Sequence, residues 1–508
     1  MDILSALGTG FAVAATPFNL LMVLTGCFLG TIIGALPGIG PINGVAILMP
    51  IAYALNFPPE SALILLAGVY YGAEYGGRVS SILLNVPGDA GAVMTTLDGH
   101  PMALRGEAAK ALALSAVSSF IGGTFAVIMI TIIGPVLASV AISFGPPEYV
   151  GLMVFAFATL AAMVGSNAAK TLIGAAIGLM IATIGVDSGT GVDRFTFGSP
   201  NLLDGIDFLV VVIGLFGISE LFSLIEKHGG EVIKTSGLGR IAITVKDVLD
   251  VKWTLVRSSI IGFVIGVLPG TGASVASAVA YGTERRLAGP NSMFGQGDPR
   301  GLAAPEAANN ASAGGAMVPM LTLGVPGSGT TAILLGVLLL FNITPGPLLF
   351  TQRPDIAWGL IASMYIGNVA LLIINLPLAG LIARMIMLPT AYLVPAIAVL
   401  TFVGVFSVAG HDFELYMMIG LGVFGYILRK MHFSLAPVIL GVVLGEIFEQ
   451  NLRRSLSMSD GDWSILFHSP ATIALWLIAA AVLFLPYLLE KVKRPQPRLA
   501  KPEVLGEE

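Results

Sequence analysis

Three long stretches of this 508-residue chain contain no Asp, Glu, Lys or Arg. They run from Ile3 to Pro59, from Ala111 to Pro147 and from Ala307 to Gln352. A helix needs about 20 apolar residues to cross a bilayer, and each stretch exceeds that length. Only 11% of all residues are charged, whereas soluble domains contain about a quarter. We therefore expect an all-α integral membrane protein that crosses the bilayer several times, joined by short turns with few charges.

Helix-breaking residues interrupt the first of these stretches. The segment GTIIGALPGIGPINGVAILMP, residues 30–50, carries Pro37 and Gly38 in its middle. A related segment, GFVIGVLPGTGASVASAVAY, follows at residues 262–281. A broken helix persists in a membrane only against protein or a water-filled cavity, because the freed backbone groups need partners.

The two segments match at equivalent positions, and a second motif repeats in the same order. Two motifs repeated in order indicate a duplicated unit. The matching residues are Gly30, Gly34, Leu36, Pro37, Gly38 and Gly40 with Gly262, Gly266, Leu268, Pro269, Gly270 and Gly272, and then Val86-Pro87-Gly88-Asp89 with Val325-Pro326-Gly327-Ser328.

We therefore expect two structural repeats joined by a polar linker. The linker and the C-terminal tail are rich in Lys and Arg, which predicts that both lie in the cytoplasm. The predicted parts are a first membrane repeat at 1–225, a basic cytoplasmic linker at 226–254, a second membrane repeat at 255–448, an additional C-terminal transmembrane helix with its loop at 449–490 and a cytoplasmic tail at 491–508.

Positive charge bears on the orientation of the repeats. The approach to the first motif, residues 1–29, has no Lys or Arg, whereas the approach to the second includes Lys252 and Arg257. Equivalent ends that differ in positive charge favour an inverted topology. Arg453 and Arg454 count against it, because an inverted second repeat would end outside the cell.

The paired breaks predict broken or re-entrant helices that meet at the membrane midplane. A half-helix that begins after a break presents unpaired N–H groups and a partial positive charge, which suits an anion. Small polar side chains follow the breaks, and their hydroxyl and amide groups can hold carboxylate oxygens. Close packing at Gly-rich faces is the alternative interpretation. The residues predicted to bind substrate are Gly38, Gly40, Asn43, Asn85, Gly270, Gly272, Ser274, Ser328, Thr330 and Arg78.

Charged side chains near the breaks have two interpretations each. Arg78 could pair with Glu74 one turn away, or face a cavity and meet an anionic substrate. Asp89 could hold a cation together with backbone carbonyls, or cap the following helix. Sodium is the expected coupling cation, with a proton as the alternative. The residues predicted to bind the cation are Val86, Gly88, Asp89, Val325 and Gly327.

Motifs for catalysis and nucleotide binding are absent from the sequence. It contains no GxxxxGK[ST] phosphate loop, no HExxH zinc motif and no GxSxG nucleophile motif, and its five histidines lack metal-ligand spacing. We expect no enzyme activity, cofactor, transition metal or nucleic-acid partner. A membrane-embedded hydrolase could use only Ser407 with His411, for which a loop-edge histidine is the simpler interpretation.

At these motifs the sequence resembles the large membrane subunit of the bacterial tripartite tricarboxylate transporters, over essentially the whole chain. The combination of motifs is specific, although each alone is weak. The resembling residues are Gly34-Ala35-Leu36-Pro37-Gly38-Ile39-Gly40, Gly266-Val267-Leu268-Pro269-Gly270-Thr271-Gly272, Tyr71-Gly72, Val86-Pro87-Gly88, Asp98-Gly99-His100-Pro101, Gly324-Val325-Pro326-Gly327 and Ile343-Thr344-Pro345-Gly346-Pro347.

The resemblance implies a multi-pass protein of the bacterial inner membrane that takes up citrate-like di- or tricarboxylates. It implies uptake driven by an ion gradient, with alternating access around the midplane site. It also implies two partners, a small membrane subunit and a periplasmic binding protein that delivers the substrate. An uncoupled carboxylate channel or facilitator is the alternative within transport.

Overall fold

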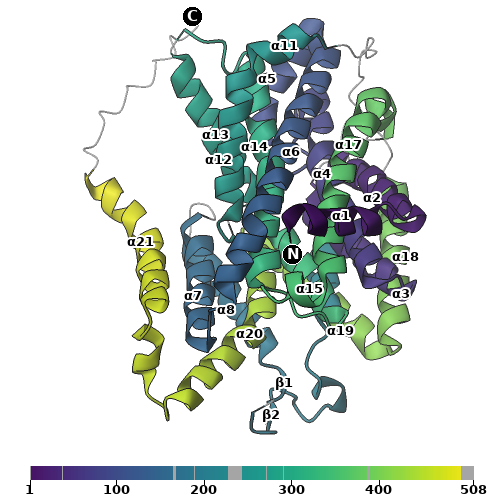
Figure 1. Cartoon of the computed structure of the whole chain (residues 1–508). Helices are drawn as coiled ribbons and strands as arrows, with labels where there is room; N and C mark the ends of the chain where they lie inside the picture. Colours follow the sequence, from purple (N-terminus) through teal and green to yellow (C-terminus); the bar gives the residue numbers. More distant parts are fainter. Residues whose placement is uncertain are drawn as a thin grey trace, which may run out of the picture.

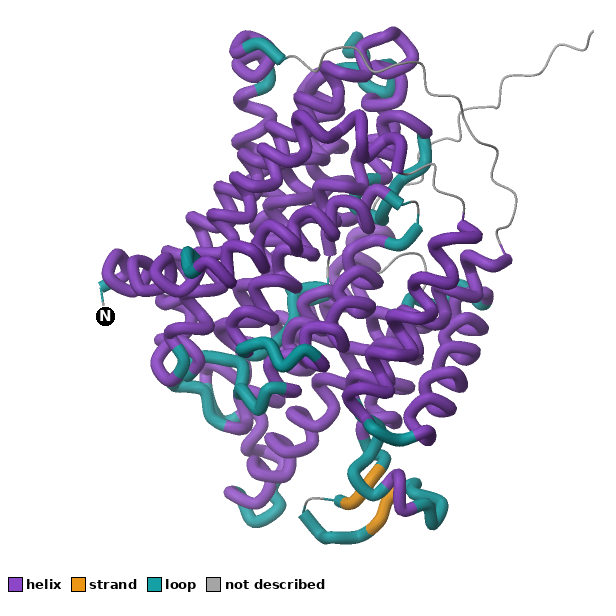
Figure 2. Tube along the Cα trace, turned by 90° about the vertical axis from the view of Figure 1, so that its right-hand side faces the viewer, coloured by secondary structure: helices purple, strands orange, loops and turns teal. Residues whose placement is uncertain are grey.

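A computed structural model describes residues 2–36, 38–163, 168–187, 189–226, 243–270, 272–289, 291–385 and 390–492. This part of the chain is almost entirely helical, as Figure 2 shows, which confirms the predicted all-α class. Within it, the only strands form one small antiparallel hairpin, in which Gly185 pairs with Arg194 and Val186 with Asp193.

The elements follow one another along the chain with short connections (Figure 1). Up to the basic linker they are α1 (Ile3–Ala14), α2 (Pro17–Ala35), α3 (Gly40–Ala54), α4 (Pro59–Leu84), α5 (Val93–Met102), η1 (Ala103–Glu107), α6 (Ala108–Ala141), α7 (Pro146–Met163), α8 (Ala168–Ala182), β1 (Gly185–Val186), β2 (Asp193–Arg194), η2 (Pro200–Leu202), α9 (Phe208–Val212), η3 (Ile213–Ile218) and α10 (Ser219–Glu226). After it they are α11 (Val245–Asp250), α12 (Lys252–Val267), α13 (Gly272–Ala288), α14 (Pro299–Leu323), α15 (Gly329–Leu340), α16 (Leu349–Gln352), α17 (Pro354–Met385), α18 (Thr390–Ala409), α19 (Asp412–Lys430), α20 (Ala436–Met458), η4 (Trp463–Phe467) and α21 (Pro470–Val492).

Several helices have the length and composition of membrane spans. Among the described residues, four are long and apolar enough to cross a bilayer, and seven shorter apolar helices accompany them. Exposed apolar side chains also line outer faces: Ile128, Ile132 and Val136 form one exposed stripe at helical spacing on α6. Such a stripe suits contact with lipid. The four long helices are Pro17–Ala35, Val93–Ala141, Phe208–Glu226 and Pro354–Pro377.

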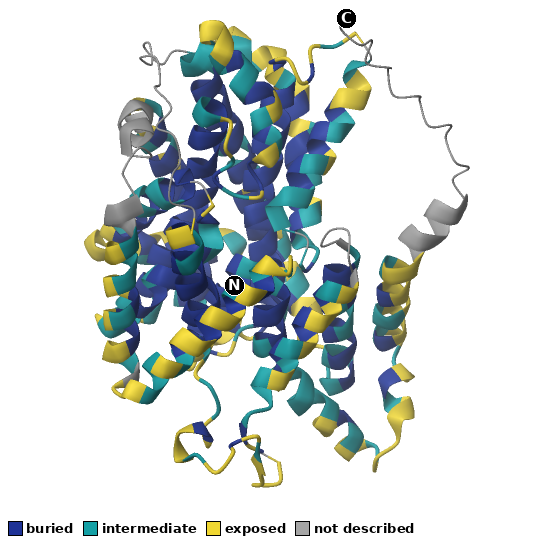
Figure 3. Cartoon of the chain, turned by 180° about the vertical axis from the view of Figure 1, so that it is seen from behind, coloured by how far each residue is buried: buried dark blue, intermediate teal, exposed yellow. Residues whose placement is uncertain are grey.

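Two central helices, α4 and α14, form the middle of the molecule. Every residue from Ser61 to Ile82 of α4 is buried, and so is every residue from Gly301 to Thr322 of α14. Figure 3 shows the buried residues gathered in the central helices, while α21 is exposed over much of its length. A helix that is buried all round is surrounded by protein, so α4 and α14 can carry polar residues that lipid would not tolerate.

All four predicted breaks lie between helices. The LPG breaks, residues 36–40 and 268–272, separate α2 from α3 and α12 from α13. The VPG breaks, residues 86–88 and 325–327, follow α4 and α14. Each of these central helices ends with a residue in the left-handed conformation, Asn85 at φ 56° and Gly324 at φ 68°.

The predicted division into repeats stays a prediction, although some helices cross its boundaries. Helix α20 runs from Ala436 to Met458 without a break at residue 448, because its apolar first half continues directly into a polar second half. Helix α12 begins at Lys252, inside the predicted linker. Residues 227–242 of the linker and 493–508 of the tail lie outside the described residues.

Candidate functional site

Each LPG break contacts the VPG break of its own half of the chain. The backbone N–H of Gly38 donates to the carbonyl oxygen of Gly88 over 3.1 Å, and that of Gly270 donates to Gly327 over 2.9 Å. Gly38 and Gly270 have φ of 88° and 81°, a conformation that favours glycine. These two N–H groups are therefore engaged within the protein in this conformation. The predicted cation-binding carbonyls of Gly88 and Gly327 accept the same two bonds.

Close helix packing holds the breaks in place. A Cβ added at Gly34 would lie 2.0 Å from the carbonyl oxygen of Ala73 on α4. A Cβ added at Gly266 would lie 2.3 Å from the carbonyl oxygen of Ser312 on α14. Thus α2 packs against α4 as α12 packs against α14, and glycine is needed where the backbones approach. The packing interpretation of the GxxxG spacing is correct for these glycines, and it coexists with a cavity at the breaks.

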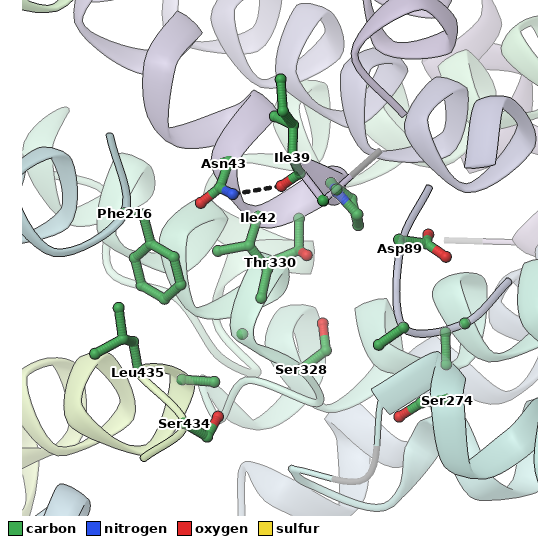
Figure 4. Close-up of a pocket in the computed structure, with 18 of the residues that line it drawn as sticks. Ile39, Ile42, Asn43, Asp89, Phe216, Ser274, Ser328, Thr330, Ser434 and Leu435 are labelled. Carbon is green, nitrogen blue, oxygen red and sulfur yellow. Dashed lines mark hydrogen bonds between the residues drawn. The ribbon is translucent and has the colours of Figure 1, made fainter. Parts of the chain in front are cut away.

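A cavity of about 360 Å³ lies between the breaks (Figure 4). Many predicted substrate and cation residues line it. In the view of Figure 4, Asp89 and Ser274 lie on one side and Phe216 and Leu435 on the other. We call it the central cavity. The residues that were predicted to bind substrate or cation and that line this cavity are Gly38, Gly40, Asn43, Asp89, Ser274, Ser328 and Thr330.

Four helices begin at the central cavity. Its lining includes first-turn residues of α3, α13, α15 and α20, namely Gly40, Ser274, Thr330 and Ala436. The first-turn N–H groups of a helix have no partner within that helix and carry a partial positive charge. The Oγ of Ser328 accepts the N–H of Thr331 in a capping box, so it satisfies one such group of α15. Four helix N-termini at one cavity favour an anion there.

Sequence reasoning missed a positively charged residue, Arg429, which also lines the central cavity. Its guanidinium donates to the carboxylate of Glu220, a buried residue of α10, and the amide of Asn43 donates to the same carboxylate over 3.3 Å. The residues lie far apart in sequence and share no motif. The basic ending of α19, Arg429 with Lys430, was the only signal available.

Arg78 lies in a different polar group. Its Nη1 donates to Ser119 Oγ over 3.2 Å, Ser119 donates to Glu306 over 2.9 Å, and Thr95 donates to Glu306 over 2.6 Å. The sequence suggested that Arg78 either pairs with Glu74 or faces a cavity, and this arrangement is neither of the two. No ion pair joins Arg78 to Glu74 among the described residues, and Arg78 does not line the central cavity. Its contact with substrate stays a prediction.

Two carboxyl groups face the central cavity, those of Glu74 and Asp89. Asp89 Oδ1 accepts the N–H of Ala92, the residue before α5, over 2.7 Å, while Oδ2 is buried without a partner among the described residues. The same holds for Oε2 of Glu74. Both interpretations of Asp89 stay predictions. The sequence placed Asp89 at the predicted cation site but not Glu74, which lies on α4 about three turns before the break.

The remaining predicted residues lie outside the cavity lining. Asn85 caps the end of α4 and is exposed, Gly270 lies against Leu160, and Gly272 begins α13. Val86 is partly exposed and Val325 is fully buried, and neither reaches the cavity. Their predicted roles are not tested by these positions.

Other features do not form a second site of this kind. Two further cavities of about 320 and 370 Å³ lie beside α20 and contain none of the residues predicted to bind substrate. Ser407 is exposed and donates to the carbonyl of Val403 in its own helix, with no hydrogen bond to His411 among the described residues. No cluster of three or more His, Cys, Asp or Glu suited to a metal occurs in the described ranges.

Comparisons of the sequence with known proteins identify one family and two relatives. A model of the tripartite tricarboxylate transporter TctA family matches residues 20–440. An uncharacterised 52.8 kDa protein in the TAR-I ttuC' 3' region of Agrobacterium vitis is 38% identical over 494 residues, 97% of this chain and 98% of that protein. An uncharacterised protein in the TAR-II ttuC' 3' region of the same organism is 40% identical over 233 residues, 45% of this chain and 96% of that protein. No solved structure matches.

Proposed function

Because the chain belongs to the tripartite tricarboxylate transporter TctA family, a family of membrane transporters and not of enzymes, we propose the following function for it. It carries out secondary active uptake of citrate-like di- and tricarboxylates across the bacterial inner membrane. The proposed energy source is an ion gradient, as the family resemblance implies, and the sequence itself contains no phosphate loop. Sodium is the proposed coupling ion.

One observation carries the proposal: four helices begin at a single cavity that four helix breaks surround. The cavity of about 360 Å³ falls in the usual range for a small-molecule site, about 300–1,000 Å³. First-turn N–H groups near Gly40, Ser274 and Thr330 offer an anion several donors at once. Broken helices that meet inside a membrane protein are also where secondary transporters bind their substrates.

Charge and hydroxyl groups supplement these backbone donors. Ser274 and Thr330 supply hydroxyls, and Arg429 supplies a guanidinium that can hold a carboxylate through two parallel hydrogen bonds. In this conformation Glu220 holds the guanidinium at the cavity edge. A substrate with several carboxylates can engage the helix N-termini and Arg429 together, which supports a di- or tricarboxylate over a monocarboxylate.

The proposed mechanism is alternating access between two repeats of opposite orientation. Equivalent hydrogen bonds join Gly38 to Gly88 and Gly270 to Gly327, which supports equivalent roles for the two pairs of breaks. The breaks with their half-helices would move as units against the packed scaffold around α4 and α14. In the proposed complex, a periplasmic binding protein delivers the substrate and a small membrane subunit accompanies this chain.

Uptake of labelled citrate and succinate by proteoliposomes tests the function. The assay compares a sodium gradient, a pH gradient and no gradient, each with and without the binding protein. We expect accumulation above the equilibrium level only with a sodium gradient and with the binding protein present. Uptake that only equilibrates under every condition would instead establish an uncoupled facilitator, and no uptake of any carboxylate would refute the proposal.

A further inference from the structure

We propose that Glu74, Asp89 and Asn309 form the binding site of the coupling sodium ion, directly beside the central cavity. The inference rests on the proposed function, because it assigns the coupling ion of that transport to named side chains. It places the ion on α4, on the first VPG break and on α14, and so differs from a site built of the VPG carbonyls alone. We call these residues the Glu74–Asp89–Asn309 cluster.

Unpartnered buried atoms mark this cluster. Asn309 is 1% exposed, and both its amide oxygen and its amide nitrogen lack a hydrogen-bond partner among the described residues. Glu74 is 3% exposed, and its Oε2 is also without one. Buried polar atoms in native proteins are almost always hydrogen-bonded, so the unpaired oxygens in this cluster are available to bind a ligand.

The three residues lie close together. A Cβ added at Gly77, one turn beyond Glu74 on α4, would be 3.2 Å from Asp89 Oδ1. The backbone at Gly91 also lies against the Asn309 amide, since a Cβ added there would be 2.4 Å from Asn309 Oδ1. Glu74 and Asp89 line the central cavity, so an ion bound between them would lie next to the substrate.

No nearby cation neutralises the two carboxylates. Arg429 pairs with Glu220 and Arg78 donates to Ser119, and neither forms an ion pair with Glu74 or Asp89 in the part of the chain that the structure describes. An anionic substrate beside two uncompensated carboxylates would be repelled in a site of low dielectric constant. A bound cation removes this repulsion, so cation binding and substrate binding favour each other.

The donor atoms favour a metal cation over a proton. All three side chains offer oxygens, which are the ligands that hard cations prefer. A proton shared by the two carboxyl groups would leave the Asn309 oxygen without a role, whereas a sodium ion would use it.

Sodium binding to the full-length chain in lipid nanodiscs tests the proposal without requiring transport. The measurement is the rise in unfolding temperature with increasing NaCl, with KCl added to hold the total salt constant. The variants are Glu74→Gln, Asp89→Asn and Asn309→Leu. Asn309→Asp retains an oxygen at that position, and Glu60→Gln places the same substitution as Glu74→Gln in the first turn of α4, outside the cavity.

We expect sodium to stabilise the wild type, Glu60→Gln and Asn309→Asp. The first three variants should bind sodium at least roughly tenfold more weakly, since Glu74→Gln and Asp89→Asn each replace a charged oxygen ligand with a neutral one and Asn309→Leu removes its oxygen. The three variants lie on separate elements, so a folding defect in one leaves the other two informative. Wild-type sodium affinity in Asp89→Asn and Asn309→Leu, or stabilisation of the wild type by low pH in place of sodium, would overturn the proposal.

The outcome separates this inference from the proposed function. A wild-type chain that accumulates citrate but shows no specific sodium stabilisation would refute the cluster and leave the transport function in place. A chain that binds sodium at the cluster but transports no carboxylate would refute the function alone.

Discussion

The backbone N–H of Gly38 donates to the carbonyl oxygen of Gly88 over 3.1 Å. This bond joins the first LPG break to the first VPG break, which lie about fifty residues apart in sequence and side by side in the fold. Gly270 and Gly327 make the equivalent bond over 2.9 Å. Each pair of breaks is therefore one structural unit, and both units border the central cavity.

Replacing Gly38 or Gly270 with Ala should abolish uptake and leave membrane insertion intact. Both residues have a positive φ, where a Cβ costs roughly 1–2 kcal/mol, so the backbone would shift and the bond to the VPG break would weaken. The measurement is citrate uptake normalised to the amount of inserted protein. Gly282→Ala is the control, since a Cβ at that helical position meets no atom within 4 Å. Normal uptake by both variants would contradict the role of the breaks.

Replacing Gly34 or Gly266 with Ala should lower stability itself. The added methyl group would overlap the carbonyl oxygens of Ala73 and Ser312, and overpacking of this kind costs about 1–3 kcal/mol. The unfolding temperature in detergent should therefore fall for both variants, and more than for Gly282→Ala. An unchanged unfolding temperature would show that α2 and α4, or α12 and α14, can move apart to accept the methyl group without loss of stability, and would contradict this prediction.

Arg429→Gln should weaken substrate binding by roughly 10–100-fold, the usual loss for a hydrogen bond between charged groups. Arg429→Lys should retain part of the affinity, because it keeps the charge but loses the paired geometry. The measurement is the citrate affinity of the wild type and of each variant, determined by calorimetry. Lys430→Gln is the matched control, since Lys430 pairs with Glu226 and does not line the cavity. Equal losses in Arg429→Gln and Lys430→Gln would point to a general charge effect.

The loop that contains β1 and β2 should resist acid. The N–H groups of Gly189 and Thr190, with the guanidinium of Arg453, hold the pKa of Asp187 at about 2. Because this folded-state pKa is lowered, the stabilisation is complete above the unfolded pKa of about 3.9 and is lost as the pH falls through about 2. Pepsin cleavage of residues 185–203 should therefore accelerate between pH 4 and pH 2.

Asp187→Asn should remove this pH dependence, and its loop should be cleaved rapidly throughout the range. Asp193→Asn is the control, because Asp193 lies in the same hairpin and forms no ion pair within the described residues. A loop that is cleaved equally fast in wild type and Asp187→Asn at pH 4 would refute the anchoring role of Asp187.

The sequence predicted the helical membrane fold and the location of the helix breaks, because both depend on local chemistry. Uncharged runs require helices in lipid, and Pro-Gly pairs interrupt them wherever they fold. Small polar residues beside the breaks, such as Ser274 and Thr330, line the cavity, because they directly follow the breaks in the sequence.

The charged part of the site could not be predicted in this way, because it depends on packing between distant helices. Arg429 and Glu220 meet from α19 and α10, and Asn309 reaches the backbone at Gly91 from the middle of α14. Arg78 carried the strongest charge signal near a break, yet α4 directs it toward Ser119 and Glu306. Which face of a buried helix meets the cavity follows from its neighbours, and no periodicity in an all-buried helix records it.

The most direct test of the central claim is substrate protection of a cysteine placed in the central cavity. The only native cysteine, Cys27, is fully buried, so Ser274→Cys provides a single reactive thiol on the cavity lining. Thr190→Cys, on the exposed loop between β1 and β2, is the control. If the breaks enclose the carboxylate site, citrate slows thiol labelling of Ser274→Cys and leaves that of Thr190→Cys unchanged. Labelling of Ser274→Cys that is unaffected by saturating citrate would contradict the account.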